Sequence, residues 1–145
     1  MKKITYIVLL VLIVLLVGVM VKFKYMVEEK TTVSISGQEF HVEMVSAKTQ
    51  LEKGLGGRDS LCDDCGMLFI FPQSGSYSFW MKDMRFNLDI IWIENGKITF
   101  IARNVSFDSK ETINPRVPAD RVLEINAGLS DKYGFKVGDN VEISQ

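Results

Sequence analysis

Residues 66–93 read GMLFIFPQSGSYSFWMKDMRFNLDIIWI, and this stretch decides the fold of the chain. Residues 67–71 and 88–93 are apolar runs of the length and the β-branched or aromatic character of strands. Between and within them lie Trp80, Lys82, Asp83 and Asp89, polar or amphipathic side chains in a largely apolar context. A charge buried without a partner costs several kcal/mol or shifts its pKa. The stretch therefore predicts strands that carry a polar site.

Two hairpins are predicted around this stretch. Residues 33–35 and 40–44 alternate apolar and polar side chains on either side of a turn at Gly37-Gln38. Residues 88–93 continue through Asn95-Gly96 into residues 97–102, and Asn-Gly favours the type I′ turn that matches the twist of paired strands.

The remaining elements are short. We expect strands at residues 122–126 and 140–143, a helix over residues 47–53 and one helical turn at residues 130–134. Ser46 is the expected cap of the helix, and Gly54 stands where a left-handed terminating residue is expected. The prediction is a mainly β domain, a small antiparallel β-sandwich or barrel with one or two short helices.

An uncharged apolar run occupies residues 4–21, ITYIVLLVLIVLLVGVMV. At ~1.5 Å per residue, a helix of this length covers roughly 27 Å, close to the thickness of a bilayer. The alternative is a cleaved signal peptide, but the run exceeds the usual core of ~7 to 15 residues and no small-x-small cleavage site follows it. The first cysteine, Cys62, lies too far on for lipid attachment. We expect an uncleaved transmembrane helix.

The chain thus divides into a membrane anchor with its connector, residues 1–30, and one β-rich domain, residues 31–145. Lysines flank the apolar run on both sides, so the orientation rests on the short amino-terminal tail, which favours an extracytoplasmic domain. The domain has twelve Lys and Arg residues against sixteen Asp and Glu residues. This acidic balance, without a basic stripe, argues against a nucleic-acid partner.

Five motifs in order carry a resemblance to a known family: GLGGRDSL at 54–61, GMLFIF at 66–71, FWMKDM at 79–84, LDIIWI at 88–93 and VLEINAG at 122–128. Over roughly residues 33–144 the chain resembles the Domain of Unknown Function 192 family. The resemblance implies a compact β-rich domain, often secreted or tethered behind a signal or anchor, without an established biochemical role.

The family pattern carries over onto the following positions: Gly54, Leu55, Gly57, Arg58, Gly66, Met67, Leu68, Phe69, Phe79, Trp80, Met81, Lys82, Leu88, Asp89, Leu123 and Glu124. The chain departs from it where Asp83-Met84 replaces Asn-Thr, Gly56 replaces a methionine and Asn87 replaces a proline. An amide that donates and accepts has thus become a carboxylate that normally only accepts. If the family binds a ligand through that amide, this chain binds a different one.

The ligand-binding candidates are the polar residues of these motifs: Arg58, Trp80, Lys82, Asp83, Asp89 and Glu124. Lys82 and Arg58 would donate to an anion, and Trp80 would offer a stacking face. In the alternative interpretation, Asp89 or Glu124 pairs with Arg58 or Lys82 in a structural cluster, while residues 79–81 pack as core. Strand alternation places Trp80 and Lys82 on one face of their segment, opposite Phe79, Met81 and Asp83.

Cys62-Asp63-Asp64-Cys65 forms a CxxC motif, which fits a tight disulfide, half a metal site or a redox pair. A zinc site needs four ligands and the chain adds only His41, which we expect to face solvent, so no metal or cofactor is predicted. Thioredoxin-like chemistry needs the motif to open a helix after a strand, whereas this one precedes a strand. A structural disulfide is favoured.

The sequence thus predicts a binding or accessory module with a small-ligand or partner site around Trp80 and Lys82. One alternative is a hydrolase-like enzyme that uses Asp83 or Asp89 with Lys82, although no nucleophile motif stands beside a base. Another is a structural interaction protein without a pocket, which would expose an apolar patch instead.

Overall fold

The computed structural model describes residues 31–144, together with Ile13 and Leu16. The expected transmembrane helix, residues 4–21, otherwise lies outside the described residues. Within the part that is described, no helix has the length and apolar character needed to cross a membrane.

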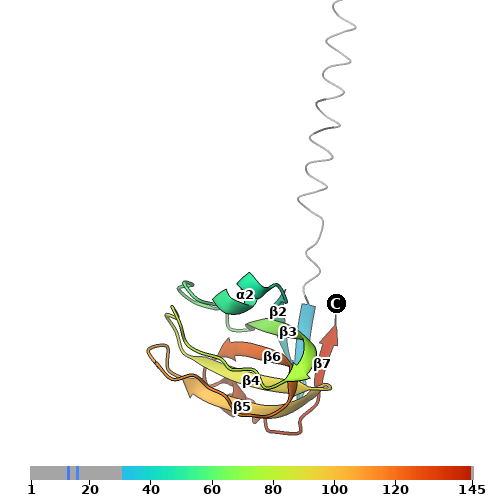
Figure 1. Ribbon diagram of the computed structural model, residues 1–145. Helices are drawn as coiled ribbons and strands as arrows, with labels where there is room; N and C mark the ends of the chain where they lie inside the picture. Colours follow the sequence, from blue (N-terminus) through green and yellow to red (C-terminus); the bar gives the residue numbers. More distant parts are fainter. Residues whose placement is uncertain (1–12, 14–15, 17–30, 145) are drawn as a thin grey trace, which may run out of the picture.

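Seven strands and two short helices make up the domain (Figure 1). The strands are β1 (Thr31–Ile35), β2 (Gln38–Val45), β3 (Cys65–Gly75), β4 (Leu88–Glu94), β5 (Lys97–Val105), β6 (Ala119–Asn126) and β7 (Val141–Ser144). The helices are α2 (Lys48–Lys53) and α3 (Leu129–Lys132). Each strand and helix predicted for residues 31–145 is present, with ends shifted by a few residues.

All seven strands belong to one sheet, in the order β5-β4-β6-β3-β2-β1-β7. Neighbours run antiparallel, except that β2 and β3 are parallel. The sheet curls so that its two edges approach each other at one end, where Ile98 of β5 donates its N–H to the carbonyl of Asp139 at 3.0 Å. The mainly β prediction is confirmed, and the architecture is a single curled sheet, a half-barrel.

The hairpin turns follow from residues that tolerate positive φ. Asn95 and Gly96 have φ of 50° and 71°, as the type I′ prediction requires. The first turn lies at Ser36-Gly37, one residue earlier than expected, because Ile35 pairs with Gln38 and leaves these two residues as the loop.

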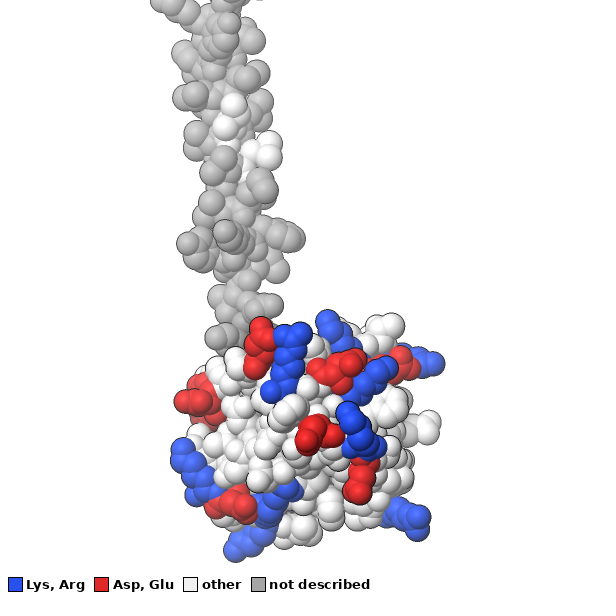
Figure 2. Space-filling model, turned by 90° about the vertical axis from the view of Figure 1, so that its left-hand side faces the viewer, with Lys and Arg blue, Asp and Glu red and all other residues white. Residues whose placement is uncertain are grey.

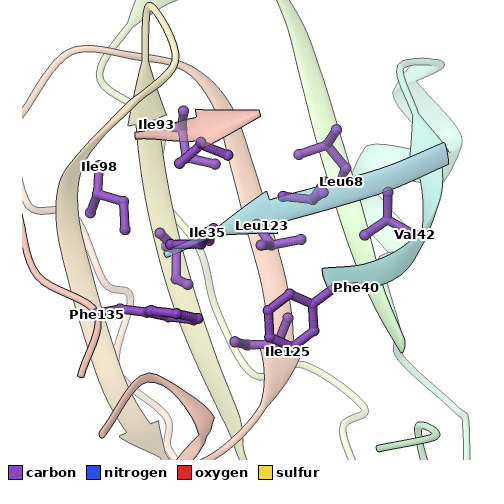
Figure 3. Packing of buried hydrophobic residues seen from close by; sticks show 12 residues of the cluster. Ile35, Phe40, Val42, Leu68, Ile93, Ile98, Leu123, Ile125 and Phe135 are labelled. Atoms are coloured by element: carbon purple, nitrogen blue, oxygen red, sulfur yellow. The ribbon is translucent and has the colours of Figure 1, made fainter. Parts of the chain in front are cut away.

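The concave side of the sheet holds one apolar cluster, to which every strand contributes (Figure 3). Its buried members are Val33, Ile35, Phe40, Val42, Leu68, Ile91, Ile93, Ile98, Leu123, Ile125, Phe135 and Val141. Side chains from strands far apart in the sequence point toward one another in this interior. Burial of these groups, about 25 cal/mol per Å², is the main force that holds the curl closed.

A second cluster lies on the outer side of β3, β4 and β6, beneath α2 and the loops. Its buried members are Val45, Leu55, Met67, Phe69, Met81, Leu88, Ile90, Trp92, Ala119 and Val122. Strand β4 supplies both clusters, which explains why residues 88–93 are almost continuously apolar instead of alternating. The candidate site lies in this outer layer.

Candidate functional site

Residues 79–82 cross the outer layer as an extended segment. Phe79 exchanges backbone hydrogen bonds with Ile113, at 2.9 and 2.8 Å. Met81 is buried, whereas Trp80 is 54% exposed and Lys82 is exposed, so the predicted alternation is confirmed for these residues. The alternation ends at Asp83, which was predicted to lie on the side of Met81 but is exposed and has a φ of 58°.

Between this segment, α2 and β3 lies a pocket of about 220 Å³, partly open to solvent. Five aromatic side chains line it: Phe69, Phe71, Tyr77, Phe79 and Trp80. The rings of Phe69 and Phe79 pack edge to face at 4.9 Å, and those of Phe71 and Tyr77 are stacked at 3.5 Å, between centroids. These contacts fix the walls in place before any ligand arrives.

Glu124 forms part of the pocket lining from the middle of β6. Its neighbours across the two adjacent strands are Met67 and Ile90, both apolar. The residue is only 5% exposed, and Oε2 is buried with no hydrogen-bond partner among the described residues. Burial raises the pKa of Glu124 from its ordinary value of 4.5 to about 8. The carboxyl group is therefore mainly protonated at neutral pH.

The rim of the pocket carries the charges. α2 contributes Lys48, Glu52 and Lys53, and the extended segment contributes Lys82. Lys48 and Glu52 pair at 3.9 Å as an i, i+4 pair, with both side chains mostly exposed. Such a surface pair adds at most ~0.5 kcal/mol to stability. The charged groups of the rim therefore interact mainly with solvent and are not held by fixed partners.

Of the predicted site residues, the structure brings together Trp80, Lys82 and Glu124. Asp83 lies beside this pocket but does not line it. Arg58 lies in a separate groove with Cys62 and Cys65.

Arg58 is occupied by Glu43 of β2. Its two Nη atoms donate to the two carboxylate oxygens at 2.5 and 2.7 Å, and this bidentate pair lowers the pKa of Glu43. The alternative interpretation of the sequence predicted that Arg58 or Lys82 pairs with Asp89 or Glu124. None of these ion pairs occurs within residues 31–144.

Asp89 has a structural position. It is fully buried in β4, and its carboxylate accepts backbone N–H bonds from Asn104 at 2.7 Å, Gly128 at 3.1 Å and Ser130 at 2.7 Å. It thereby ties β5 and the start of α3 to the centre of the sheet. It does not line the aromatic pocket, so a hydrolase that joins Asp89 to Lys82 finds no support in this geometry.

Gly56 and Asp83, where the chain is expected to depart from the family pattern, lie next to each other, since a Cβ atom on Gly56 would lie 3.7 Å from the Cβ atom of Asp83. A Cβ atom on Gly56 would lie 2.9 Å from the carbonyl oxygen of Lys53 and 3.1 Å from that of Lys82, so no side chain fits there without movement. Next to it, Gly57 donates its N–H to the carbonyl of Asp83 at 2.8 Å. Asp and Asn adopt positive φ more readily than most residues, which fits the φ of Asp83.

Sequence reasoning missed the other pocket residues. Phe71 and Tyr77 lie in or beside β3, and Lys48 and Lys53 belong to α2, so only the folded chain shows that they surround Glu124. One signal was present in the sequence, since Glu124 is the sole charged residue within VLEINAG at 122–128.

Cys62 and Cys65 are a close pair, with Cα atoms 5.1 Å apart and sulfur atoms at bonding distance. Asp64 lies near them, and a bond between the two sulfurs would leave no thiolate to bind a metal. His41 lies on the exposed side of β2, as expected.

Comparisons with known proteins place the chain in a family. A comparison with curated proteins found no match. A protein of unknown function from Novosphingobium aromaticivorans DSM 12444, known from a crystal structure, has 34% sequence identity to this chain. The two structures match with a TM-score of 0.72 over 78% of this chain and 83% of that one. A proposed transcription regulator from Sinorhizobium meliloti 1021 is also 34% identical, with a TM-score of 0.75, over 79% of this chain and 93% of that one. The family model of DUF192, described as "Uncharacterized ACR", matches residues 31–143, and the chain belongs to this family.

Proposed function

We propose that the domain is a ligand-binding module, tethered to a membrane by residues 4–21 with its β-rich part outside the cytoplasm, and that the aromatic pocket is its binding site. The observation that carries the proposal is the buried carboxyl group of Glu124 in the pocket lining, whose Oε2 has no hydrogen-bond partner within residues 31–144. Buried polar side chains are normally hydrogen-bonded, and each exception costs about 1–3 kcal/mol. A ligand that pairs with Glu124 removes this cost on binding.

The shape of the pocket supports a small ligand. A volume of about 220 Å³ equals the share of roughly seven water molecules in the liquid. Ligand sites are typically lined by apolar and aromatic side chains with a few polar groups that fix orientation. Here Trp80 offers an exposed ring at the edge of the pocket, and Glu124 offers the polar group within it.

The charge of the domain supports a small ligand over a nucleic acid. Residues 31–145 carry sixteen acidic against twelve basic residues. Figure 2 shows both signs interspersed on one face of the molecule, without a basic stripe on that face. Phosphate backbones are bound mainly by clustered Lys and Arg. The name of the Sinorhizobium protein is therefore not a basis for the function of this chain.

The binding proposal is tested with the full-length chain in a non-ionic detergent. The protein is incubated with the small-molecule fraction of a lysate from its own source, and retained compounds are identified by native mass spectrometry. We expect a compound that is retained by the wild type and lost from Trp80→Ala. Phe107→Ala is the matched control, because Phe107 is also an exposed aromatic residue but does not line this pocket. Retention that does not depend on Trp80 would contradict the proposed site.

The tether is tested separately in native membranes. We expect the chain to stay in the pellet after alkaline carbonate extraction, because an uncharged run of eighteen residues is held by the bilayer core. Protease added to right-side-out vesicles should digest the domain, and in inside-out vesicles the domain should survive. The reverse pattern would place the domain in the cytoplasm.

A further inference from the structure

The proposed function does not name a class of ligand. The residues that line the pocket restrict the choice. We propose that the pocket binds its ligand through a primary ammonium group, which lies among the aromatic side chains and pairs with the carboxyl group of Glu124. This inference rests on the proposed binding function and specifies its ligand.

The walls favour a cation. Aromatic rings carry negative charge on their faces, and a cation within about 6 Å of a ring centroid gains ~0.5–2 kcal/mol, most when it is desolvated. Five aromatic side chains line this one pocket, and the two ring contacts between them hold the rings in fixed orientations. Sites for quaternary ammonium ligands in other proteins use aromatic walls of this kind, and a Lys ammonium is attracted to a ring face by the same force.

Glu124 supplies the charge that such a group needs. It is the buried acidic residue of the lining, and its same-face neighbours Met67 and Ile90 offer it no hydrogen bond. An ammonium group brings three N–H donors and a positive charge. A carboxylate paired with a cation in a water-poor site forms a charge-assisted hydrogen bond about twice as strong as a neutral one.

The proton balance of the step is simple. Before binding, the Glu124 carboxyl holds a proton at neutral pH, because burial raises its pKa to about 8. On binding, the ammonium group keeps its three protons, the carboxyl group ionises, and one proton passes to solvent. Binding of the cation is therefore linked to proton release, and it strengthens as the pH rises toward 8.

The other charged or titratable groups around the pocket do not replace Glu124. They are Lys48, Glu52 and Lys53 on α2, and Tyr77 and Lys82 on the segment that follows β3. The three lysines oppose a cation, but their side chains are exposed, so the high dielectric constant of water weakens their repulsion. The other acid, Glu52, already has Lys48 as a neighbour at 3.9 Å.

Three probes with one aromatic body and different charge test the inference: 2-phenylethylamine, 2-phenylethanol and 3-phenylpropionate. Binding to the full-length chain in detergent is measured by isothermal titration calorimetry at pH 6.5, 7.5 and 8.5. We expect the amine to bind at least tenfold more tightly than the other two at pH 7.5. Its affinity should rise up to tenfold from pH 6.5 to 7.5 and level off above pH 8.

Glu124→Gln should weaken amine binding at least tenfold and remove its pH dependence, because the amide cannot ionise. Glu142→Gln, at an exposed position on β7 that does not line the pocket, is the matched control, and we expect a change of less than threefold. The pH dependence of amine affinity in the wild type also tests whether Glu124 ionises on binding. A folding defect in Glu124→Gln therefore does not prevent the test.

Amine binding that is absent, independent of pH, or no tighter than that of the alcohol or the carboxylate would overturn the inference. The proposed function survives this result if either of the other probes binds and is lost from Trp80→Ala. It fails together with the inference if no probe binds in a manner that depends on Trp80 and the lysate experiment also yields no compound whose retention depends on Trp80.

Discussion

Gly54 lies against the carboxyl group of Glu124, so that the residue that ends α2 also packs on the lining of the pocket. A Cβ atom on Gly54 would lie 3.7 Å from Oε2 of Glu124 and 3.3 Å from Cζ of Phe69. The φ of Gly54 is 51° and its ψ is −137°, a combination that residues with a Cβ atom rarely adopt. Two independent constraints therefore require glycine at this position.

Gly54→Ala is expected to destabilise the domain by about 2–3 kcal/mol, from backbone strain together with the tight contact with Phe69. Gly57→Ala is the matched control, because Gly57 also has a positive φ, of 82°, but nothing lies within 4 Å of its Cβ position. Chemical denaturation of both variants measures the difference. An equal loss in both would show that the contact with the pocket lining contributes nothing.

Glu124→Gln is expected to change how stability depends on pH. The pKa of Glu124 is raised in the folded chain to about 8 from 4.5, so the folded state holds a proton that the unfolded state has lost between these values. Burial of Glu124 therefore carries no ionisation cost below about pH 4.5, and the free energy of unfolding falls as the pH rises from there to about 8. The loss is then constant, on the order of a few kcal/mol.

The measurement is urea denaturation of the full-length wild type and Glu124→Gln at pH 5, 7 and 9. We expect the variant to lack this fall and to be the more stable protein at pH 9. Glu142→Gln, at an exposed position on β7, should follow the wild type. If the free energy of unfolding changed with pH in the same way for the wild type and Glu124→Gln, the carboxyl group would be paired in solution.

Asp89→Asn is expected to destabilise the domain by about 3 kcal/mol or more. The carboxylate oxygens of Asp89 accept three backbone N–H bonds, and an amide group replaces one of these oxygens with a donor. The midpoint of chemical denaturation measures the loss, with the exposed Asp63→Asn as control. A shift no larger than that of the control would remove the structural role assigned to Asp89.

The cysteine pair is expected to be oxidised in protein from native membranes. Thiol counting under denaturing, non-reducing conditions should find no free thiol, and two after reduction. Because only two residues separate Cys62 and Cys65, the loop-closure model gives the bridge ~2 kcal/mol. The double substitution Cys62→Ser, Cys65→Ser should lower stability by about that amount. Two free thiols before reduction would contradict the disulfide.

Local sequence patterns were sufficient for the strands and for the Asn95-Gly96 turn, and they placed the first turn within one residue of Ser36-Gly37. The geometry of a two-residue hairpin turn is set by the two adjacent residues that form it, so Asn95-Gly96 predicts its own turn type. Alternation also predicts which side of residues 79–82 is buried. The parallel pairing of β2 with β3 is a long-range contact, and no residue pattern within either strand distinguishes it from an antiparallel pair.

The candidate site was only partly predictable for the same reason. Trp80, Lys82 and Glu124 stand out as polar or amphipathic residues in apolar runs, and the structure places them at one pocket. Asp89 stands out equally, but its partners are the backbone N–H groups of Asn104, Gly128 and Ser130, which no side-chain pattern reveals. A buried charge predicts a partner without saying whether that partner is a ligand or the main chain.

The division of β4 between two separate apolar clusters has a consequence for engineering. Ile91 and Ile93 fill the curled interior, whereas Trp92 supports the outer layer that forms the pocket walls. Phe71 and Tyr77 belong only to that outer layer, so they can be exchanged without opening a void among the side chains that close the curl. The side chains of the pocket wall can therefore be exchanged while the core of the sheet stays intact, which suits the domain to redesign for new ligands.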